Sequence, residues 1–178
     1  GNVDRTMIAV LSFGTGRIDI GFGTHTVDGS IYGLQTAPDF LQFYQWGMDS
    51  QTNWDPAQHT DAIGPARTPY VLETDVMTHS AADNLTTGYL NGNLMASIDG
   101  TLATNPGPFH AGLNGWGYAD GGLNEVLIYD RLLSPAEQSQ VNAYLNYKWY
   151  GISPEVGEIL PTNTTVSVAD GAALDLNN

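Results

Sequence analysis

The sequence contains no cysteine, so neither a disulfide bond nor a thiolate metal or redox site can form. Positive charge is nearly as scarce, since five lysines and arginines stand against 19 aspartates and glutamates, for a formal net charge of −14. Such a chain repels polyanions and anionic surfaces, so nucleic acid is not an expected partner. No stretch approaches the roughly 20 apolar residues that span a bilayer, so membrane insertion is not expected either.

Glycine is abundant instead, with 21 residues, and it separates short segments in which apolar and polar side chains alternate. Alternation with a period of two predicts β-strands, and frequent glycine-rich turns favour an all-β chain over a helical bundle. Asn91–Gly92 accepts the positive φ angles of a tight hairpin turn. The expected strands occupy residues 3–13, 16–23, 30–36, 39–47, 70–80, the two halves of 84–99, 108–115 and 121–130.

One helix is expected after the last strand. Ser134, Pro135 and Glu137 form a capping box, with serine as the cap and proline at the first helical position. Gly151 suits the left-handed residue that ends a helix. The predicted fold class is therefore all-β, an antiparallel jelly-roll β-sandwich with one C-terminal α-helix.

Two segments carry a resemblance to a known family. "TTGYLNGNLMAS" (86–97) and "FHAGLNGWGYADGGLNEVLIYDRLLSPAEQSQVNAYLNYKWYGI" (109–152) resemble a laminin-G-like domain of the concanavalin A-like lectin/glucanase superfamily, of the type found in bacterial surface proteins. "RTMIAVLSF" (5–13) is similar to an early strand of such domains. The resemblance implies a lectin-like β-sandwich over residues 1–152.

The C-terminal "ILPTNTTVSVADGAALDLNN" (159–178) resembles the opening of an autotransporter-associated β-strand repeat. Residues 153–178 are accordingly expected to be a linker or the first strand of a following β-repeat. The two resemblances together imply a secreted bacterial protein, located outside the cell or on its surface, with neighbouring β-repeats of the same precursor as partners.

Three acids surround the last strand: Asp120, Glu125 and Asp130. Glu125 alternates in step with Leu123, which predicts a shared strand face and a partly buried carboxylate. The favoured interpretation is structural, in which these acids close the turns at either end of the strand. The alternative is a structural Ca²⁺ ion held by Asp120 and Asn124, since hard cations prefer oxygen ligands. The family pattern has Asp-Glu where this sequence has Asn124–Glu125, so one carboxylate fewer is present.

Glu73 and Asp75 form the pair best suited to glycoside hydrolysis, because residues at i and i+2 share one face of a strand. Two such acids act as nucleophile and acid/base when their separation is suitable. The more favoured interpretation is that they are polar residues on a solvated sheet face.

Aromatic residues provide the leading functional hypothesis. The non-periodic segment 48–69 and the glycine-rich segment 114–122 are predicted loops, and loops of such length commonly carry function. Aromatic rings stack on the apolar faces of sugars while short polar side chains bond the hydroxyl groups. The candidate ligand-binding residues are Trp54, Trp116 and Tyr118 with Asn53, Asp55, His59 and Asn114.

These residues predict a non-catalytic carbohydrate-binding or adhesion domain whose partner is a polysaccharide or glycan. Two alternatives are a polysaccharide-degrading glycoside hydrolase, which would use Glu73 and Asp75, and a structural spacer domain in an adhesin. No catalytic residue is assigned under the leading hypothesis.

Overall fold

The computed structural model describes residues 1–16, 18–23, 31–37, 40–45, 68–104, 107–112 and 120–153. The chain divides into two compact units, Gly1–Ser134 and Pro135–Asn178, which are considered separately. The predicted boundary between residues 152 and 153 stays a prediction.

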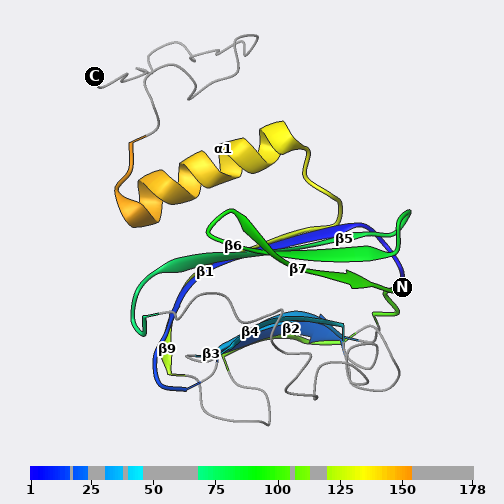
Figure 1. Ribbon diagram of the computed structural model, residues 1–178, viewed down its shortest axis with the longest axis horizontal. Helices are drawn as coiled ribbons and strands as arrows, with labels where there is room; N and C mark the ends of the chain where they lie inside the picture. The colour runs from blue at the N-terminus through cyan, green and yellow to red at the C-terminus, as the bar shows by residue number, and fades with distance from the viewer. Residues whose placement is uncertain are drawn as a thin grey trace, which may run out of the picture. The chain divides into compact units, whose positions relative to one another are not determined.

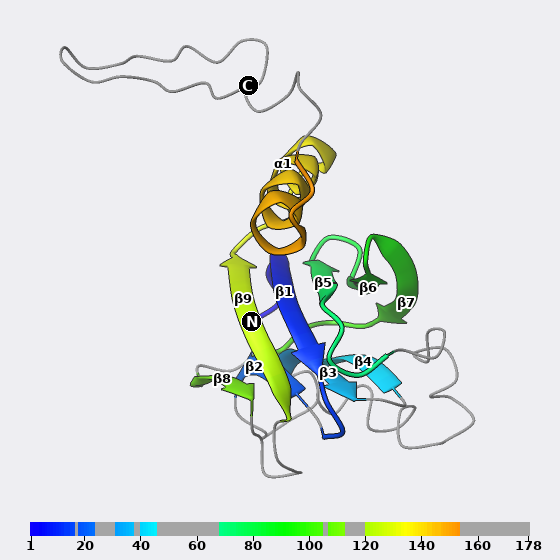
Figure 2. The ribbon, with the colours of Figure 1, turned by 90° about the vertical axis from the view of Figure 1, so that its left-hand side faces the viewer.

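The first unit is a β-sandwich, as its alternating segments predict (Figure 1). In the described ranges, sheet A has the strand order β7-β6-β5-β1-β9 and sheet B the order β4-β3-β2-β8. Every printed strand pairing is antiparallel, and Figure 2 shows the two sheets as separate layers. The strands are β1 (Arg5–Phe13), β2 (Ile18–Gly23), β3 (Ile31–Ala37), β4 (Phe40–Gln45), β5 (Glu73–Ser80), β6 (Leu85–Leu90), β7 (Asn93–Asp99), β8 (Phe109–Gly112) and β9 (Gly121–Tyr129).

The hydrophobic core lies between the sheets, where every second residue of a strand points inward. Burying a large aliphatic or aromatic side chain stabilises a fold by about 1.5–3 kcal/mol, so this layer drives the association of the sheets. Its buried members are Met7, Ala9, Leu11, Phe13, Ile18, Ile20, Tyr32, Leu34, Phe43, Met77, Leu90 and Leu102.

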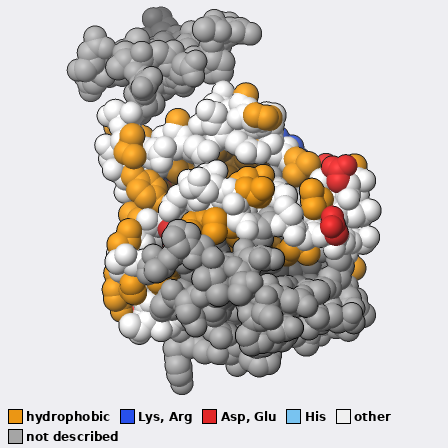
Figure 3. Space-filling model, in the orientation of Figure 1, with side chains coloured by type: hydrophobic (Ala, Val, Ile, Leu, Met, Phe, Trp, Pro, Cys, Tyr) orange, Lys and Arg blue, Asp and Glu red, His pale blue; other side chains and the backbone are white. Residues whose placement is uncertain are grey.

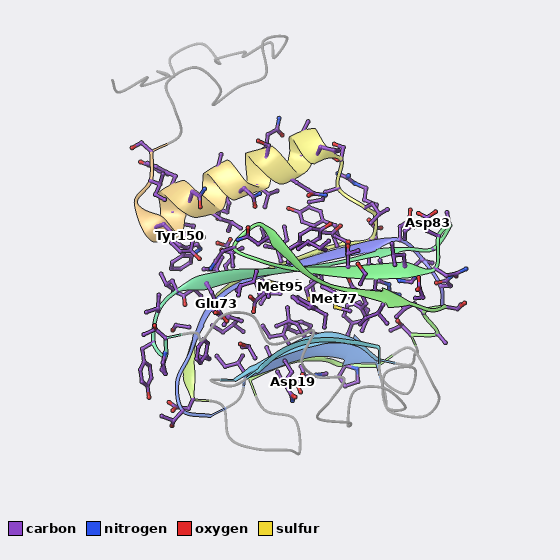
Figure 4. The ribbon with its side chains drawn as sticks, in the orientation of Figure 1. Asp19, Glu73, Met77, Asp83, Met95 and Tyr150 are labelled. Atoms are coloured by element: carbon purple, nitrogen blue, oxygen red, sulfur yellow. The ribbon has the colours of Figure 1, made fainter. Side chains whose placement is uncertain are left out.

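Strands β3 and β5 face each other across this core. The Tyr32 hydroxyl donates a 2.7 Å hydrogen bond to the backbone carbonyl of Met77, and the Thr36 hydroxyl donates a 3.1 Å bond to Glu73 Oε1. Figure 4 shows Met77 and Glu73 between the two sheets. At the opposite end of β1, the guanidinium of Arg5 lies 4.5 Å from the centroid of the Phe22 ring, a cation–π contact between the layers.

The register of β1 with β9 shifts between Val10 and Leu11. Glu125 lies opposite Val10, whereas Leu123 lies opposite Leu11. Because Val10 and Leu11 point to opposite faces, so do Glu125 and Leu123, and Asn124 is the additional residue of a β-bulge. The prediction that Glu125 and Leu123 share a face is therefore wrong, since alternation cannot reveal an inserted residue. The expected partial burial of Glu125 is confirmed.

Strand β5 begins at Glu73 rather than at residue 70. Tyr70 lies in a turn, where its backbone N–H donates a 2.7 Å hydrogen bond to the Phe13 carbonyl at the end of β1. This bond joins Tyr70 to the end of β1 outside the regular pairing. The ladder between β5 and β1 starts at the Glu73–Leu11 pair.

The second unit contains helix α1 (Pro135–Leu145), which continues as one π-helical turn, η2 (Asn146–Tyr150). The predicted start at Pro135 and end at Gly151 are confirmed, and Gly151 has the left-handed φ of 66°. Its N–H bonds to the Asn146 carbonyl, which caps the final turn. Among the described residues, no helix has the length and apolarity needed to cross a membrane.

Replacement of Gly88 by alanine is predicted to destabilise the sandwich. The ring of Phe43 occupies the position that a β-carbon at Gly88 would take, so the ring must move within a packed core. Overpacking of this kind costs about 1–3 kcal/mol. Urea unfolding of Gly88→Ala, Phe43→Leu and the double variant measures the effect. The double variant should lose less free energy of unfolding than the sum of the losses in the two single variants. Strict additivity would contradict this packing.

Acidification is predicted to weaken the fold through His79, which is fully buried. Its Nε2–H donates to Asn2 Oδ1 over 2.7 Å, and its Nδ1 lies 2.8 Å from the Thr86 hydroxyl. Burial, and secondarily the charge of Arg5, lowers the pKa of His79 from its ordinary 6.5. This contribution to stability is fully present above pH 6.5 and is lost as pH falls through the lower folded-state pKa.

The measurement is the free energy of unfolding between pH 7.5 and 5. His79→Gln, which keeps neutral hydrogen-bonding groups, should be less stable at pH 7.5 and should lose less stability on acidification. An equal loss in both proteins would rule out this assignment.

Candidate functional site

Sheet B carries a polar group on the face that points away from the core. Ile18 and Ile20 point into the core, so Asp19 between them points to the opposite side, as Figure 4 shows. Gln35 is the direct partner of Asp19 on β3, and His110 stands on β8 two residue pairs further along, opposite Gly21. Three strands thus bring an acid, an amide and an imidazole together on one face.

Hydrogen bonds hold this group in a fixed geometry. The Gln35 amide Nε2 donates to Asp19 Oδ2 over 3.1 Å, and the Nε2 of His110 lies 3.2 Å from Asp19 Oδ1. The carboxylate is almost fully buried, whereas 23% of the His110 side chain is exposed. Because a carboxylate oxygen accepts, the His110 Nε2–H donates this bond. His110 is therefore the member of the group that a ligand reaches first.

Two glycines lie beside these side chains. Gly21 pairs with Gly33 in the row next to Asp19 and Gln35. A β-carbon at Gly21 would lie 3.0 Å from the Tyr32 carbonyl oxygen, 3.1 Å from the Gly33 Cα and 3.2 Å from His110 Cε1. Both glycines are buried, and His110 lies against them, so the exposed part of this group is the His110 side chain. We call Asp19, Gln35, His110, Gly21 and Gly33 the sheet B site.

A second polar group lies where β1 ends and β9 begins. Asp120 Oδ2 accepts hydrogen bonds from the backbone N–H and the hydroxyl of Thr15, both 2.7 Å long, and from the Tyr70 hydroxyl over 3.2 Å. The backbone carbonyl of Asp120 also accepts from the Gly14 N–H over 2.6 Å. The bonds from Thr15 hold the pKa of Asp120 below its ordinary value, and the same carboxylate raises the pKa of the Tyr70 phenol. Asp120 thus joins three chain segments.

At the other end of β9 the junction is closed by Thr6. Its hydroxyl donates to the Arg131 carbonyl over 3.0 Å and accepts from the Leu133 N–H over 3.3 Å. Asp130 is exposed beside this junction. The chain bends at Asp130 and Arg131, where a turn is predicted. The Thr6 side chain of β1 bonds to the backbone that follows this bend.

Glu73 and Asp75 are 5% and 0% exposed, and they share the inner face of β5 with Met77. The interpretation of a solvated sheet face is therefore wrong, because this face of sheet A is the one that packs against sheet B. Both carboxylates lie inside the sandwich rather than on a surface that a polysaccharide could contact. Glu73 instead receives the hydrogen bond of Thr36 that connects the sheets.

The calcium site predicted at Asp120 and Asn124 stays a prediction. Calcium takes about six to eight oxygen ligands, whereas Asp120 Oδ2 already receives three hydrogen-bond donors. Asn124 is an exposed residue of the β9 bulge. Within the described part of the chain, no three His, Asp or Glu side chains are grouped so that they could hold a metal ion.

The ligand-binding residues predicted from the sequence fall outside the described residues: Trp54, Trp116, Tyr118, Asn53, Asp55, His59 and Asn114. The sheet B site was missed because its members are separated by up to 91 positions and form no motif. One signal was present, since Asp19 interrupts the apolar residues of the strand "RIDIGF". Only the strand order shows that Asp19 lies beside Gln35 and His110.

Comparison with solved structures identifies similar folds. The CBM40 module of the Ruminococcus gnavus IT-sialidase, in a structure with α2,3 sialyllactose bound, has a TM-score of 0.51 and 16% identity, covering 77% of this chain and 80% of that one. The NanB sialidase of Streptococcus pneumoniae has a TM-score of 0.50 and 13% identity, covering 78% of this chain and 24% of that one. The leech intramolecular trans-sialidase has a TM-score of 0.50 and 13% identity, with 77% and 23% covered.

No protein-family model matches the sequence, and no curated protein sequence does. The similarity to the carbohydrate-binding module extends over most of both chains, whereas this chain spans 24% or less of the two sialidases. The predicted fold class, a jelly-roll-like β-sandwich with one C-terminal helix, is confirmed. The finer resemblance to a laminin-G-like domain followed by a β-repeat stays a prediction.

Loss of the Asp120 charge is predicted to loosen the junction of β1 and β9. Asp120→Asn should lower the melting temperature at pH 7, because the carboxylate accepts from Thr15 and Tyr70. Since the folded-state pKa lies below the ordinary 3.8, the stabilisation is present above pH 3.8 and is lost as pH falls through the folded-state value. The difference between wild type and variant should shrink at pH 3. Asp99→Asn, at an exposed position, is the control, and equal effects of the two substitutions would contradict the assignment.

Proposed function

We propose that this β-sandwich is a non-catalytic carbohydrate-binding domain that contacts a glycan through the sheet B site. The observation that carries the proposal is the Asp19 carboxylate, held on the non-core face by Gln35 and His110 beside a pair of glycines. Supporting it, a structural neighbour that spans a similar length is a carbohydrate-binding module with a bound sialyl-oligosaccharide.

Sugar hydroxyl groups both donate and accept hydrogen bonds, so they need donors and acceptors at fixed positions. The Asp19–His110 pair supplies these without a change of conformation, which lowers the entropic cost of binding. The exposed part of His110, 23% of its side chain, is the proposed point of contact. Trp54, Trp116 and Tyr118 are proposed to add stacking surfaces, with Asn53, Asp55, His59 and Asn114 as polar neighbours.

The proposed ligand is a neutral glycan rather than an anionic one. In the first unit, the described cationic side chains are those of Arg5 and Arg131. Arg5 contacts Phe22 between the sheets and Arg131 follows β9, so neither belongs to the sheet B site. The site itself contains the carboxylate of Asp19, and the whole chain carries a charge of −14. An anionic sugar would be repelled by both.

A secreted, cell-surface protein with β-repeats after the sandwich remains our proposal for the context of this domain, on the strength of the sequence resemblance alone. Calcium dependence is proposed as a condition to test, because Asp120 and Asn124 carry oxygen ligands near the β9 start.

Binding is predicted to depend on His110. Affinity electrophoresis against neutral and sialylated glycans, with calcium and with a chelator, identifies a retained ligand, and titration calorimetry then gives its dissociation constant. His110→Ala should weaken binding about tenfold, equivalent to about 1.4 kcal/mol. Asp19→Asn should act in the same direction, because it disturbs the positions of both neighbours.

The matched control is Asp99→Asn, which removes an exposed carboxylate from β7 of the other sheet and should leave binding unchanged. Thermal unfolding of each variant verifies the fold. Undiminished binding by His110→Ala would exclude the sheet B site. Failure of the wild type to retain any glycan would refute the proposed function and leave a structural spacer domain as the better account.

A further inference from the structure

Tyr70 has a backbone conformation that tyrosine rarely adopts. Its φ angle is 61°, in the left-handed region where a β-carbon is unfavourably placed. Such a conformation persists only where the surrounding structure imposes it, and it is a common feature of ligand-binding positions. The aromatic ring is nevertheless 62% exposed, so burial of the ring does not account for it.

Both ends of Tyr70 are fixed. Its backbone N–H donates to the Phe13 carbonyl over 2.7 Å, and its hydroxyl donates to Asp120 Oδ2 over 3.2 Å. Asp120 is in turn fixed by the two hydrogen bonds from Thr15. An exposed tyrosine ordinarily changes rotamer freely, whereas this ring is held before any ligand arrives. A ligand that stacks on it therefore loses little of its binding energy to ordering the side chain.

The Asp120 carboxylate is fixed beside the Tyr70 ring. It accepts hydrogen bonds from Thr15, from the Tyr70 hydroxyl and from the backbone N–H of Gly16. Its negative charge repels anions, so it disfavours an anionic ligand at this position. A held aromatic ring beside such an acceptor fits a neutral sugar, which has an apolar C–H face and hydroxyl groups at its edge.

The corner that Tyr70 and Asp120 form lies at the end of β1 away from the β5–β6 turn, because β1 runs from Arg5 beside His79 to Phe13. On the face drawn in Figure 3, acidic side chains gather at the end of the sandwich where Figure 4 labels Asp83. Val71, next to Tyr70, is 55% exposed. Val71 and the ring of Tyr70 therefore give the corner an exposed apolar surface.

We propose that Tyr70 and Asp120 form a second contact for a neutral glycan, which extends the sheet B site to oligosaccharides. Thr15, bonded to Asp120, and Asp19 of the sheet B site are four residues apart, so their backbones are separated by at most about 14 Å. A chain of several sugars is long enough to contact both groups. The inference rests on the proposed function, because it assigns further sugar positions of the same ligand.

The experiment compares short and long ligands. Cello-, xylo-, manno- and laminari-oligosaccharides of two and six sugars are titrated into the full chain by calorimetry. Wild type should bind the hexasaccharide of the retained series at least tenfold more tightly than the disaccharide. Tyr70→Asn should remove this gain with length and leave disaccharide binding unchanged, since asparagine tolerates the left-handed conformation and keeps the turn intact.

Two matched variants separate a binding role from a structural one. Tyr70→Phe keeps the ring and loses the bond to Asp120, so it should retain part of the gain. Tyr147→Ala, at a tyrosine in the second unit that is 65% exposed, should retain all of it. Melting temperatures are measured in parallel for each protein.

The inference is overturned if Tyr70→Asn lowers the melting temperature but keeps the full gain with length, which would make Tyr70 a structural clamp. It is also overturned if wild type binds both lengths equally, a result that leaves the sheet B site in place. Binding of no oligosaccharide would overturn this inference together with the proposed function.

Discussion

The hydrogen bond from Tyr32 to the Met77 carbonyl connects the two sheets in the middle of the sandwich. A buried hydroxyl without a partner is costly, so this bond and the close packing around it restrict how sheet B can lie on sheet A. Burial also raises the pKa of Tyr32 far above its ordinary value, so the hydroxyl remains a donor at any physiological pH. With Tyr32 turned inward, Gly33 and Gln35 must face outward, and the position of the sheet B site follows from this arrangement.

Polar groups inside the sandwich serve the fold rather than chemistry. Glu73 accepts from Thr36, and His79 is held between Thr86 and Asn2. Each of these bonds satisfies a group that would otherwise destabilise the core, and each requires one particular neighbour. The two acids that most resemble a hydrolase pair in the sequence are buried on the inner face of β5. The acid that forms a pair with a partly exposed histidine, Asp19, lies on the opposite sheet.

The β-sandwich is shared with a carbohydrate-binding module and with parts of sialidases at identities of 13–16%. A common fold at that level of identity does not define a ligand, so the ligand has to be argued from the side chains. Here those side chains are a carboxylate, an amide and an imidazole on one face and a fixed tyrosine at one end. We propose that their charge favours hydroxyl-rich, uncharged partners, which differ from the sialylated ligand of the module.

The sequence by itself determined the all-β class, the approximate positions of the strands, the Asn91–Gly92 turn and the helix that starts at Pro135. The structure confirms these features in the residues it describes, except that β5 starts at Glu73 and not at Tyr70. These features are local, since strand alternation, turn chemistry and helix capping depend on residues close together in the chain. Only the tertiary structure decided which face of a strand is buried and which distant residues meet. An alternating pattern reads the same whichever face points inward, so Glu73 could not be assigned to the core from the sequence.

The same reason explains the other differences. The bulge at Asn124 is a property of two paired strands, and the left-handed turn at Tyr70 depends on a carbonyl at Phe13. The Asp19–His110 pair joins residues 91 positions apart, and that contact exists only because β2 lies beside β8. Local periodicity was therefore sufficient for the elements of this protein, whereas the candidate site needed the sheet order, because non-local pairing leaves no mark in the spacing of residues.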